Sequence, residues 1–214
     1  MKHYLHSIDL DNWLTCWNLS LNGTLISPKL FQKYNPSFVI NNVNLLLSEI
    51  TSTPTPTGIM ILANKHPKRI DVEIAFEKVR QKDYKNKPSR FNCLWVADNS
   101  DEGIILLNTM FPDDANRKSF FVEILPDSNV HKADKRWYEK YYDSPDIEYI
   151  NNYWLSKPFN ENPRWEYLID GGFKMRNEDI LFLREYILKT HINVLGKDLV
   201  EQAYKINPLK KNTN

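Results

Sequence analysis

The sequence predicts one α+β domain in which short strands are scattered among amphipathic helices. Apolar runs of strand length occur at separate places along the chain, and helical periodicity follows several of them. Strand and helix do not alternate strictly, which argues against a doubly wound parallel sheet. The 214 residues are treated as one domain, 1–214, because a chain of this length can bury a sizeable core.

The N-terminal half supplies one strand, one loop and one helix. The first strand is expected at His3–Ile8 (HYLHSI), before a polar, Trp-rich stretch. Residues 51–58 (TSTPTPTG) are expected to form a surface loop, because alternating prolines fit neither a sheet ladder nor a helix interior. A helix is expected after Asp71, a suitable N-cap, and Pro88 lies beyond its end. Its apolar residues recur at helical spacing: Val72, Ala75, Phe76 and Val79.

The C-terminal half alternates between the two kinds of element. Strands are expected at Asn92–Ala97, Ser119–Leu125 and Trp165–Ile169. Helices are expected from Ser100 or Asp101 to about Met110, and at Lys132–Tyr142, Asp146–Trp154 and Val194–Tyr204. The turn Asp170-Gly171-Gly172 predicts that Phe173–Met175 returns antiparallel. Asn177 is expected to cap a long helix, before the last helix and a polar tail at 205–214. The buried side of that long helix should hold Ile180, Leu181, Leu183, Ile187 and Leu188.

Composition narrows the function classes. The net charge of +1 gives no global field that would steer the protein to nucleic acid. Two cysteines and five scattered histidines predict neither a disulfide framework nor a metal site. The first residues lack the apolar segment of a signal peptide, and no apolar run reaches the ~20 residues of a membrane helix. We therefore expect a cytoplasmic protein that does not enter a membrane.

Three segments, in order, resemble the motifs of the ADP-ribosyltransferase superfamily, whose members hold NAD between two small sheets. The first is YLHSI, which places His6 on the first strand. The second is Cys93–Asp98 (CLWVAD), with Trp95 where the better-known branch has Tyr, and the third is Trp165–Ile169 (WEYLI), which places Glu166 on a strand. Neither GxGxxG nor GxxxxGK[ST] occurs, so a nucleotide would bind without a glycine-rich phosphate loop.

A closer resemblance is to a bacterial and phage family of uncharacterised domains assigned to that superfamily. It is carried by VEIAFEKVR (Val72–Arg80), KPSR (Lys87–Arg90), CLWV (Cys93–Val96) and the pair Tyr153-Trp154. The resemblance covers roughly residues 1–8 and 66–175. It implies a split pair of small antiparallel or mixed sheets with peripheral helices, and NAD as the substrate without a metal.

The resemblance also implies a role for each site residue. Glu166 would stabilise the positive charge that develops on the ribose as nicotinamide leaves. His6 would bind a ribose hydroxyl, and Trp95 would form a wall against the nicotinamide. Arg90 would contact the pyrophosphate, because a guanidinium forks onto phosphate oxygens, with Ser89 as a weaker candidate on the same loop.

Each of these residues also has an ordinary structural explanation. Glu166 would be a solvent-facing strand residue, Trp95 a core residue, and Arg90 a surface residue of a loop. His6 would be an ordinary strand histidine. Glu73 and Arg80 lie seven residues apart on one helix face, and we expect them to brace the loop that follows.

The resulting hypothesis is a mono-ADP-ribosyltransferase with a nucleic-acid acceptor, RNA first, acting as a toxin of a toxin–antitoxin or phage-defence system. An antitoxin or chaperone would then be a partner. Residues 132–142 (KADKRWYEKYY) mix basic and aromatic side chains, which suits phosphate contact and base stacking, although the rings would equally suit a helix face packed on the core. The alternatives are a protein acceptor, NAD hydrolysis, a catalytically degenerate binding module, and an antitoxin-like structural partner.

Overall fold

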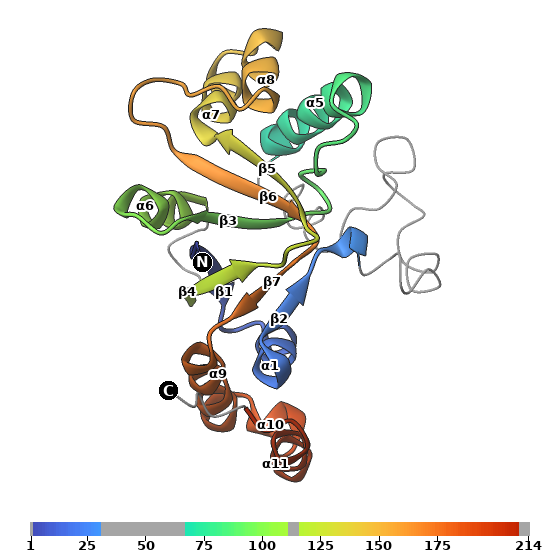
Figure 1. Ribbon diagram of the computed structural model, residues 1–214, viewed down its shortest axis with the longest axis vertical. Coiled ribbons are helices and arrows are strands. Elements are labelled where there is room, and N and C mark those ends of the chain that lie inside the picture. The colour runs from blue at the N-terminus through green and yellow to red at the C-terminus, as the bar shows by residue number, and fades with distance from the viewer. Residues whose placement is uncertain (1, 31–66, 111–115, 210–214) are drawn as a thin grey trace. The chain divides into compact units, whose positions relative to one another are not determined.

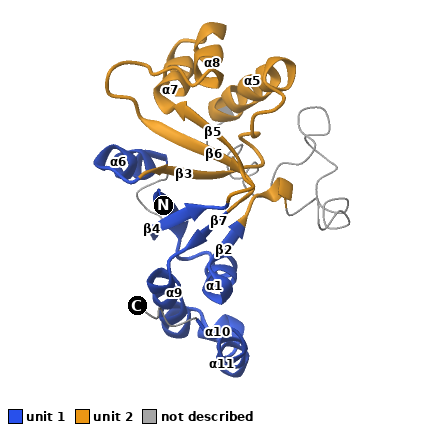
Figure 2. Ribbon diagram, viewed as in Figure 1, with its two compact units in different colours: residues 1–25, 99–125, 173–214 blue, residues 26–98, 126–172 orange. Residues whose placement is uncertain are grey.

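The computed structural model describes residues 2–30, 67–110 and 116–209 and confirms the α+β class. The chain divides into two compact units (Figure 2). Unit 1 comprises residues 1–25, 99–125 and 173–214, and unit 2 comprises residues 26–98 and 126–172. The loop predicted at 51–58 lies outside the described residues.

Unit 1 is built from antiparallel strands and the helices that flank them (Figure 1). Its strands follow the order β2-β7-β4-β1, and β1 aligns Leu5 with Phe121 of β4. Its elements are β1 (Tyr4–Asp9), α1 (Trp13–Asn22), β2 (Thr24–Ile26), α6 (Asp101–Met110), β4 (Arg117–Ile124), β7 (Gly172–Met175), α9 (Asn177–Thr190), α10 (Ile192–Leu195) and α11 (Lys197–Ile206).

Unit 2 contains three antiparallel strands in the order β3-β6-β5, and Figure 1 shows α5, α7 and α8 grouped beside them. Its elements are α5 (Pro67–Asp83), β3 (Leu94–Asp98), β5 (Asn129–Asp134), α7 (Lys135–Asp143), α8 (Ile147–Trp154) and β6 (Trp165–Asp170). The central strand β6 places Glu166 opposite Ala97 on one side and Ala133 on the other.

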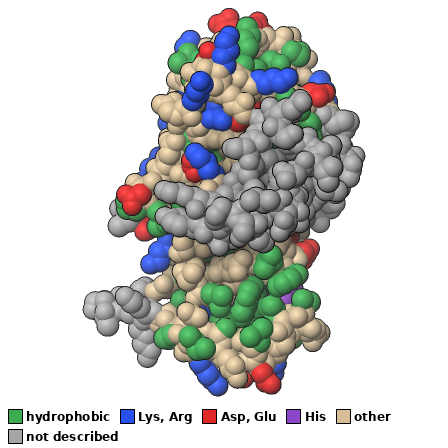
Figure 3. All heavy atoms as spheres, turned by 90° about the vertical axis from the view of Figure 1, so that its right-hand side faces the viewer, with side chains coloured by type: hydrophobic (Ala, Val, Ile, Leu, Met, Phe, Trp, Pro, Cys, Tyr) green, Lys and Arg blue, Asp and Glu red, His purple; other side chains and the backbone are tan. Residues whose placement is uncertain are grey.

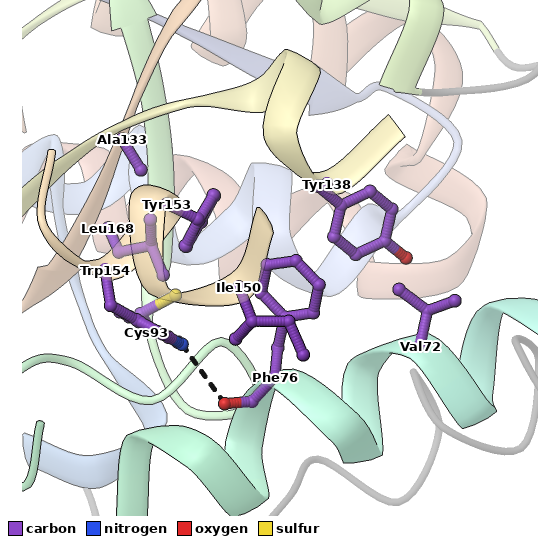
Figure 4. Packing of buried hydrophobic residues seen from close by; sticks show 9 residues of the cluster. All are labelled: Val72, Phe76, Cys93, Ala133, Tyr138, Ile150, Tyr153, Trp154 and Leu168. Atoms are coloured by element: carbon purple, nitrogen blue, oxygen red, sulfur yellow. Dashed lines mark hydrogen bonds between the residues drawn. The ribbon is translucent and has the colours of Figure 1, made fainter. Parts of the chain in front are cut away.

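The core of unit 2 joins the strands to these three helices (Figure 4). Phe76 of α5 lies at its centre, with the ring of Tyr153 edge-on at 5.1 Å between centroids. The indole nitrogen of Trp154 donates to the Phe76 carbonyl at 3.2 Å, which fixes α8 to α5. The buried members are Val72, Phe76, Cys93, Ala133, Tyr138, Ile150, Tyr153, Trp154 and Leu168.

Several expected elements are confirmed with small shifts at their ends. The helix Asp101–Met110 is as expected, and the Ser100 hydroxyl accepts from the Gly103 amide at 3.1 Å, as an N-cap does. The helix expected after Asp71 begins earlier, at Pro67, because proline is tolerated in a first turn. Asn177 is the first residue of α9 and not its cap, a place that Arg176 takes.

Other expectations were wrong. Residues 132–134 belong to strand β5 instead of a helix, and α7 starts only after Asp134, whose carboxylate accepts from the Arg136 amide at 3.1 Å. Leu181 and Leu188 are exposed, at 51% and 40%, whereas Arg184 takes a buried place on α9 and donates to backbone carbonyls. The last expected helix is divided by Gly196 into α10 and α11.

The turn after β6 also behaves differently from the prediction. Phe173–Met175 lies in β7, which pairs with β4, so it does not return along β6. Gly171 has φ +156°, and Gly172 donates its amide to the Ser128 hydroxyl at 3.0 Å. The chain therefore leaves β6 through a glycine conformation and not through a hairpin.

Replacing Gly171 with Ala is expected to lower the free energy of unfolding by about 2–4 kcal/mol, from backbone strain and overpacking. A Cβ at this position would lie 2.6 Å from the Ser128 Cα, so backbone and not a flexible side chain would have to move. Gly196→Ala is the matched control: its φ is +84° but nothing lies within 4 Å, so strain alone, about 1 kcal/mol, is expected. Urea unfolding measures both, and equal losses would contradict the clash.

The surface of unit 1 carries a group of hydrophobic side chains, which Figure 3 shows in green. Exposed apolar residues lie on several of its helices, among them Leu14 of α1, Leu199 of α11 and Ile206 of α11. Within the described ranges, every helix is too short or too polar to cross a membrane.

Candidate functional site

Glu166 is buried inside unit 2, with 1% of its surface exposed. Its Oε1 atom accepts two hydrogen bonds, from Arg90 Nη1 at 2.8 Å and from the Tyr153 hydroxyl at 2.5 Å. Its Oε2 atom is also buried and has no hydrogen-bond partner among the described residues. One oxygen of this carboxylate is therefore fixed in place, while the other keeps its full capacity to accept a hydrogen bond.

Arg90 connects Glu166 to a second carboxylate. Its Nε and Nη2 atoms donate to the two oxygens of Glu73 at 2.6 and 2.8 Å, in the bidentate geometry that a guanidinium prefers. Its Nη1 also donates to the Tyr153 hydroxyl. Arg90 thus bridges helix α5, through Glu73, to strand β6, through Glu166.

Aromatic rings surround the same guanidinium. The Arg90 Cζ atom lies 4.3 Å from the ring centroid of Trp95, 4.5 Å from that of Tyr138 and 5.1 Å from that of Tyr153. These are cation–π distances. We call the two carboxylates, the rings and the cation the Arg90 network: Glu73, Phe76, Arg90, Trp95, Tyr138, Tyr153 and Glu166.

The charges in this network reinforce one another. Burial alone would lower the pKa of Arg90, but Glu73, Tyr153 and Glu166 raise it well above its usual value. Burial would raise the pKa of Glu73, but the Arg90 charge lowers it below its usual value. Burial raises the pKa of Tyr153 well above its usual value, so its hydroxyl keeps its proton and donates to Glu166.

A second cluster holds the loop that carries Arg90. The Arg80 guanidinium donates to Glu77 at 2.6 and 2.9 Å, and its Nη1 donates to the carbonyls of Lys85 and Lys87. The Ser89 hydroxyl donates to Glu77 at 3.0 Å. The expectation that Glu73 and Arg80 brace this loop is confirmed, because each contacts it directly.

Lys135 is a further cation beside the network. Its Nζ atom lies 3.5 Å from the ring centroid of Tyr138. Burial lowers the pKa of Lys135 to about 8, although the Glu166 carboxylate raises it. An amine with this pKa is partly neutral at pH 8, so Lys135 can lose a proton near physiological pH.

His131 is a buried histidine of β5 whose ring nitrogens have no hydrogen-bond partner of suitable geometry among the described residues. Its ring stacks on Trp154, with centroids 5.2 Å apart. Burial, followed by the positive charge of Lys87, lowers the pKa of His131 from 6.5 to about 4, while the backbone of Tyr153 opposes the shift. The ring is therefore neutral at pH 7.

The free energy of unfolding is expected to fall as the pH drops from about 6.5 to about 4. In this range His131 binds a proton in the unfolded protein but stays neutral in the folded protein. The pKa difference corresponds to about 3 kcal/mol. Urea unfolding at several pH values measures this loss. His131→Phe keeps a ring against Trp154 and should flatten the curve in this window; an unchanged slope would contradict the account.

The structure brings four of the five predicted site residues into neighbouring contacts. Glu166, Arg90 and Trp95 belong to the Arg90 network, and Ser89 bonds the adjacent Glu77. The alternatives of a solvent-facing Glu166 and a surface Arg90 were wrong, because both residues are buried. His6 lies in unit 1, where its ring packs on Phe173 at 4.6 Å between centroids.

Sequence reasoning missed the two tyrosines that complete the network. Tyr153 had a signal, since it belongs to the Tyr153-Trp154 pair of the closer resemblance, but no role was assigned to it. Tyr138 and Lys135 lie in the segment considered for nucleic-acid contact. The segments of the closer resemblance thus meet in one place, because Glu73, Arg90, Trp95 and Tyr153 each come from a different one.

The rings of residues 132–142 are used inside unit 2. Tyr138 is buried, and Trp137, Tyr141 and Tyr142 pack against the core cluster. Trp137 also donates its indole N–H to the Lys157 carbonyl at 2.9 Å. The rings therefore follow the alternative of an aromatic face packed on the core.

In the part of the chain that the structure describes, no three His, Cys, Asp or Glu side chains are placed to hold a metal ion.

Comparison with known proteins places the chain in a family. Residues 21–181 match the model of a family described as "Protein of unknown function (DUF2441)". No curated protein matches the chain. The matched range is more than half of the sequence, includes the whole Arg90 network and begins after His6.

Proposed function

The chain belongs to the DUF2441 family, and we propose that it is a mono-ADP-ribosyltransferase that consumes NAD and uses Glu166 at the nicotinamide ribose. In this chemistry the bond between nicotinamide and ribose breaks, and positive charge develops on the sugar. A fixed carboxylate stabilises that charge and can accept the proton of the attacking group. The split pair of small sheets belongs to the same proposal.

The observation that carries the proposal is the Oε2 atom of Glu166, buried and without a partner among the described residues. Leaving a buried acceptor unpaired costs about 1–3 kcal/mol, so a buried carboxylate oxygen without a protein partner is explained by a water, an ion, a ligand or a catalytic role. The proposal assigns this oxygen to the ribose of NAD. The other oxygen is held by Arg90 and Tyr153, which orients the carboxylate as a reacting group requires.

Two further residues have roles in this proposal. Trp95 lies beside the Arg90 guanidinium and would stack on the nicotinamide ring. His6 would bind a ribose hydroxyl, as the sequence resemblance implies. Arg90 itself contacts Glu73 and Glu166, so a contact with the pyrophosphate requires these ion pairs to open.

For the acceptor we propose nucleic acid, RNA first, in a toxin whose partner is an antitoxin or chaperone. Of the basic side chains of residues 132–142, Lys140 is exposed and supports phosphate contact. The other three lie on rings or on a carboxylate, namely Lys132, Lys135 and Arg136. The packed rings do not support base stacking by this segment. Transfer to protein and plain NAD hydrolysis remain the alternatives within this chemistry.

A binding module that has lost catalysis is the second candidate. The observation that favours it is the burial of Glu166 together with its ion pair to Arg90, since buried ion pairs also serve structural roles. Such a module would bind NAD or a related ligand without releasing nicotinamide.

The function is tested by incubating the protein with NAD labelled in the adenylate, separately with RNA, DNA and cell protein. We expect label in the RNA pool with the wild type and none with Glu166→Gln. Label in protein would support the protein acceptor, and nicotinamide release without label would support hydrolysis. No label and no release would contradict the enzyme and leave the binding module or the antitoxin-like structural partner.

A further inference from the structure

The Arg90 guanidinium is a planar cation enclosed by the groups that recognise planar cations. Two carboxylates neutralise it, from Glu73 at 2.6 Å and from Glu166 at 2.8 Å. Of the four rings around the guanidinium, that of Trp95 on strand β3 lies nearest, with its centroid 4.3 Å from Arg90 Cζ. Aromatic rings together with carboxylates are how proteins bind organic cations, so the network has the composition of a ligand site with a side chain inside it.

The NAD pyridinium ring has the same two properties, since it is flat and carries a positive charge. The carboxylate proposed to act on the ribose, Glu166, is the one that the Arg90 cation now pairs. A pyridinium stacked on Trp95 beside Glu166 would overlap the place of the guanidinium. Ligand and side chain would therefore exclude each other.

We propose that Arg90 is an internal competitor of the substrate, whose guanidinium occupies the place of the NAD pyridinium and must leave before NAD binds productively. The inference rests on the proposed function for the identity of the natural ligand. It adds to that function a closed state of the enzyme, in which Glu166 is buried and paired with Arg90.

The exposed fractions of the network's side chains indicate the direction in which Arg90 would move. The Glu73 side chain is 14% exposed, against 2% for Arg90 and 1% for Glu166. The loop is held separately: Arg80 donates to the carbonyls of Lys85 and Lys87, and the Ser89 hydroxyl donates to the Glu77 carboxylate. The Arg90 side chain can therefore turn toward the Glu73 side while its loop stays in place.

The movement also changes what Arg90 can bind. The N–H groups that now make four hydrogen bonds to Glu73, Glu166 and Tyr153 become available to phosphate oxygens. The pyrophosphate contact expected for Arg90 from the sequence thus belongs to the open state. Because only open molecules bind NAD, the apparent affinity for NAD equals the affinity of the open state multiplied by the fraction of molecules that are open.

The test uses Arg90→Ala with two small probes of similar shape, the cation 1-methylnicotinamide and neutral nicotinamide, which differ by one N-methyl group and the charge that it brings. Binding is followed by the melting temperature and by tryptophan fluorescence of the full-length protein. We expect 1-methylnicotinamide to bind Arg90→Ala at least about ten-fold more tightly than it binds the wild type, and nicotinamide to bind it at least about ten-fold more weakly than the cation does. Adding Trp95→Ala should abolish the preference.

A second variant, Glu73→Gln with Arg90→Ala, removes one carboxylate together with the cation and covers the case in which Arg90→Ala does not fold. Saturating 1-methylnicotinamide should restore the fold of either variant. Equal binding of the two probes, equal binding to wild type and variant, or failure of the cation to restore folding would overturn the proposal. Nicotinamide release from NAD by the wild type is measured in parallel. Preferential binding of the cation without nicotinamide release would contradict only the proposed function. Nicotinamide release without preferential binding of the cation would contradict only this inference.

Discussion

Replacing Arg90 with Met is expected to lower the free energy of unfolding by about 3–5 kcal/mol. Most of the loss is expected from the two carboxylates, because Glu73 and Glu166 would lose the guanidinium that lies between them. Lys135 would stay nearby, but its amine cannot replace the hydrogen bonds that Arg90 makes to both. Breaking a buried ion pair from one side leaves an uncompensated charge, which is the costly case. Urea unfolding of the two proteins measures the difference.

The pH dependence of this loss identifies its cause. The Arg90 charge lowers the pKa of Glu73 in the folded state, so its stabilisation is present above about pH 4 and is lost as the pH falls and the carboxyl group protonates. The difference between wild type and Arg90→Met should therefore shrink below about pH 4. Arg164→Met is the matched control in the same unit: its ion pair with Glu139 is 40% exposed on both sides, and about 0–1 kcal/mol is expected. Similar losses for the two variants would contradict the account.

Replacing Glu166 with Gln is expected to slow nicotinamide release from NAD by about 10²-fold or more, because the amide cannot stabilise positive charge on the ribose. The fold should persist, since the amide oxygen can still accept from Arg90 and Tyr153. Initial rates at saturating NAD, compared with the melting temperature of each protein, separate chemistry from folding.

The control for this variant is Glu161→Gln, an exposed carboxylate in the same unit. It should leave the rate of nicotinamide release unchanged. A normal rate for Glu166→Gln together with a loss for Glu161→Gln would move the catalytic assignment to Glu161. Normal rates for both variants would remove the carboxylate from the mechanism.

The sequence predicted those elements whose burial pattern is strong along the chain. Helix α6 agrees with its expected range because Ser100 caps an apolar run of helical period. Strand β6 agrees because its residues form an apolar run ending at a turn. Strand β5 was missed because apolar and polar residues alternate only weakly in its sequence, NVHKAD, and a helix was expected to begin at Lys132. Arg184 shows the same limit, since its burial depends on carbonyls of α1 far away in the sequence.

Three members of the Arg90 network were predicted from the sequence, but the contacts that join them were not. Arg90, Trp95 and Glu166 were expected to act on one ligand, and the structure joins them to one another. The partners of Arg90 lie 63 residues away at Tyr153 and 76 residues away at Glu166, distances over which local periodicity carries no information. The sequence led us to expect the Arg90 guanidinium on a phosphate. Its carboxylate partners, Glu73 and Glu166, come close to it only when the helices and strands pack together.

The most direct test of the central claim is a crystal structure of Glu166→Gln with NAD bound. The account predicts the nicotinamide ring against Trp95, the side chain at position 166 within hydrogen-bonding distance of the nicotinamide ribose, and the Arg90 guanidinium turned away from both. NAD bound elsewhere on the protein, with Arg90 still seated between Glu73 and position 166, would contradict it.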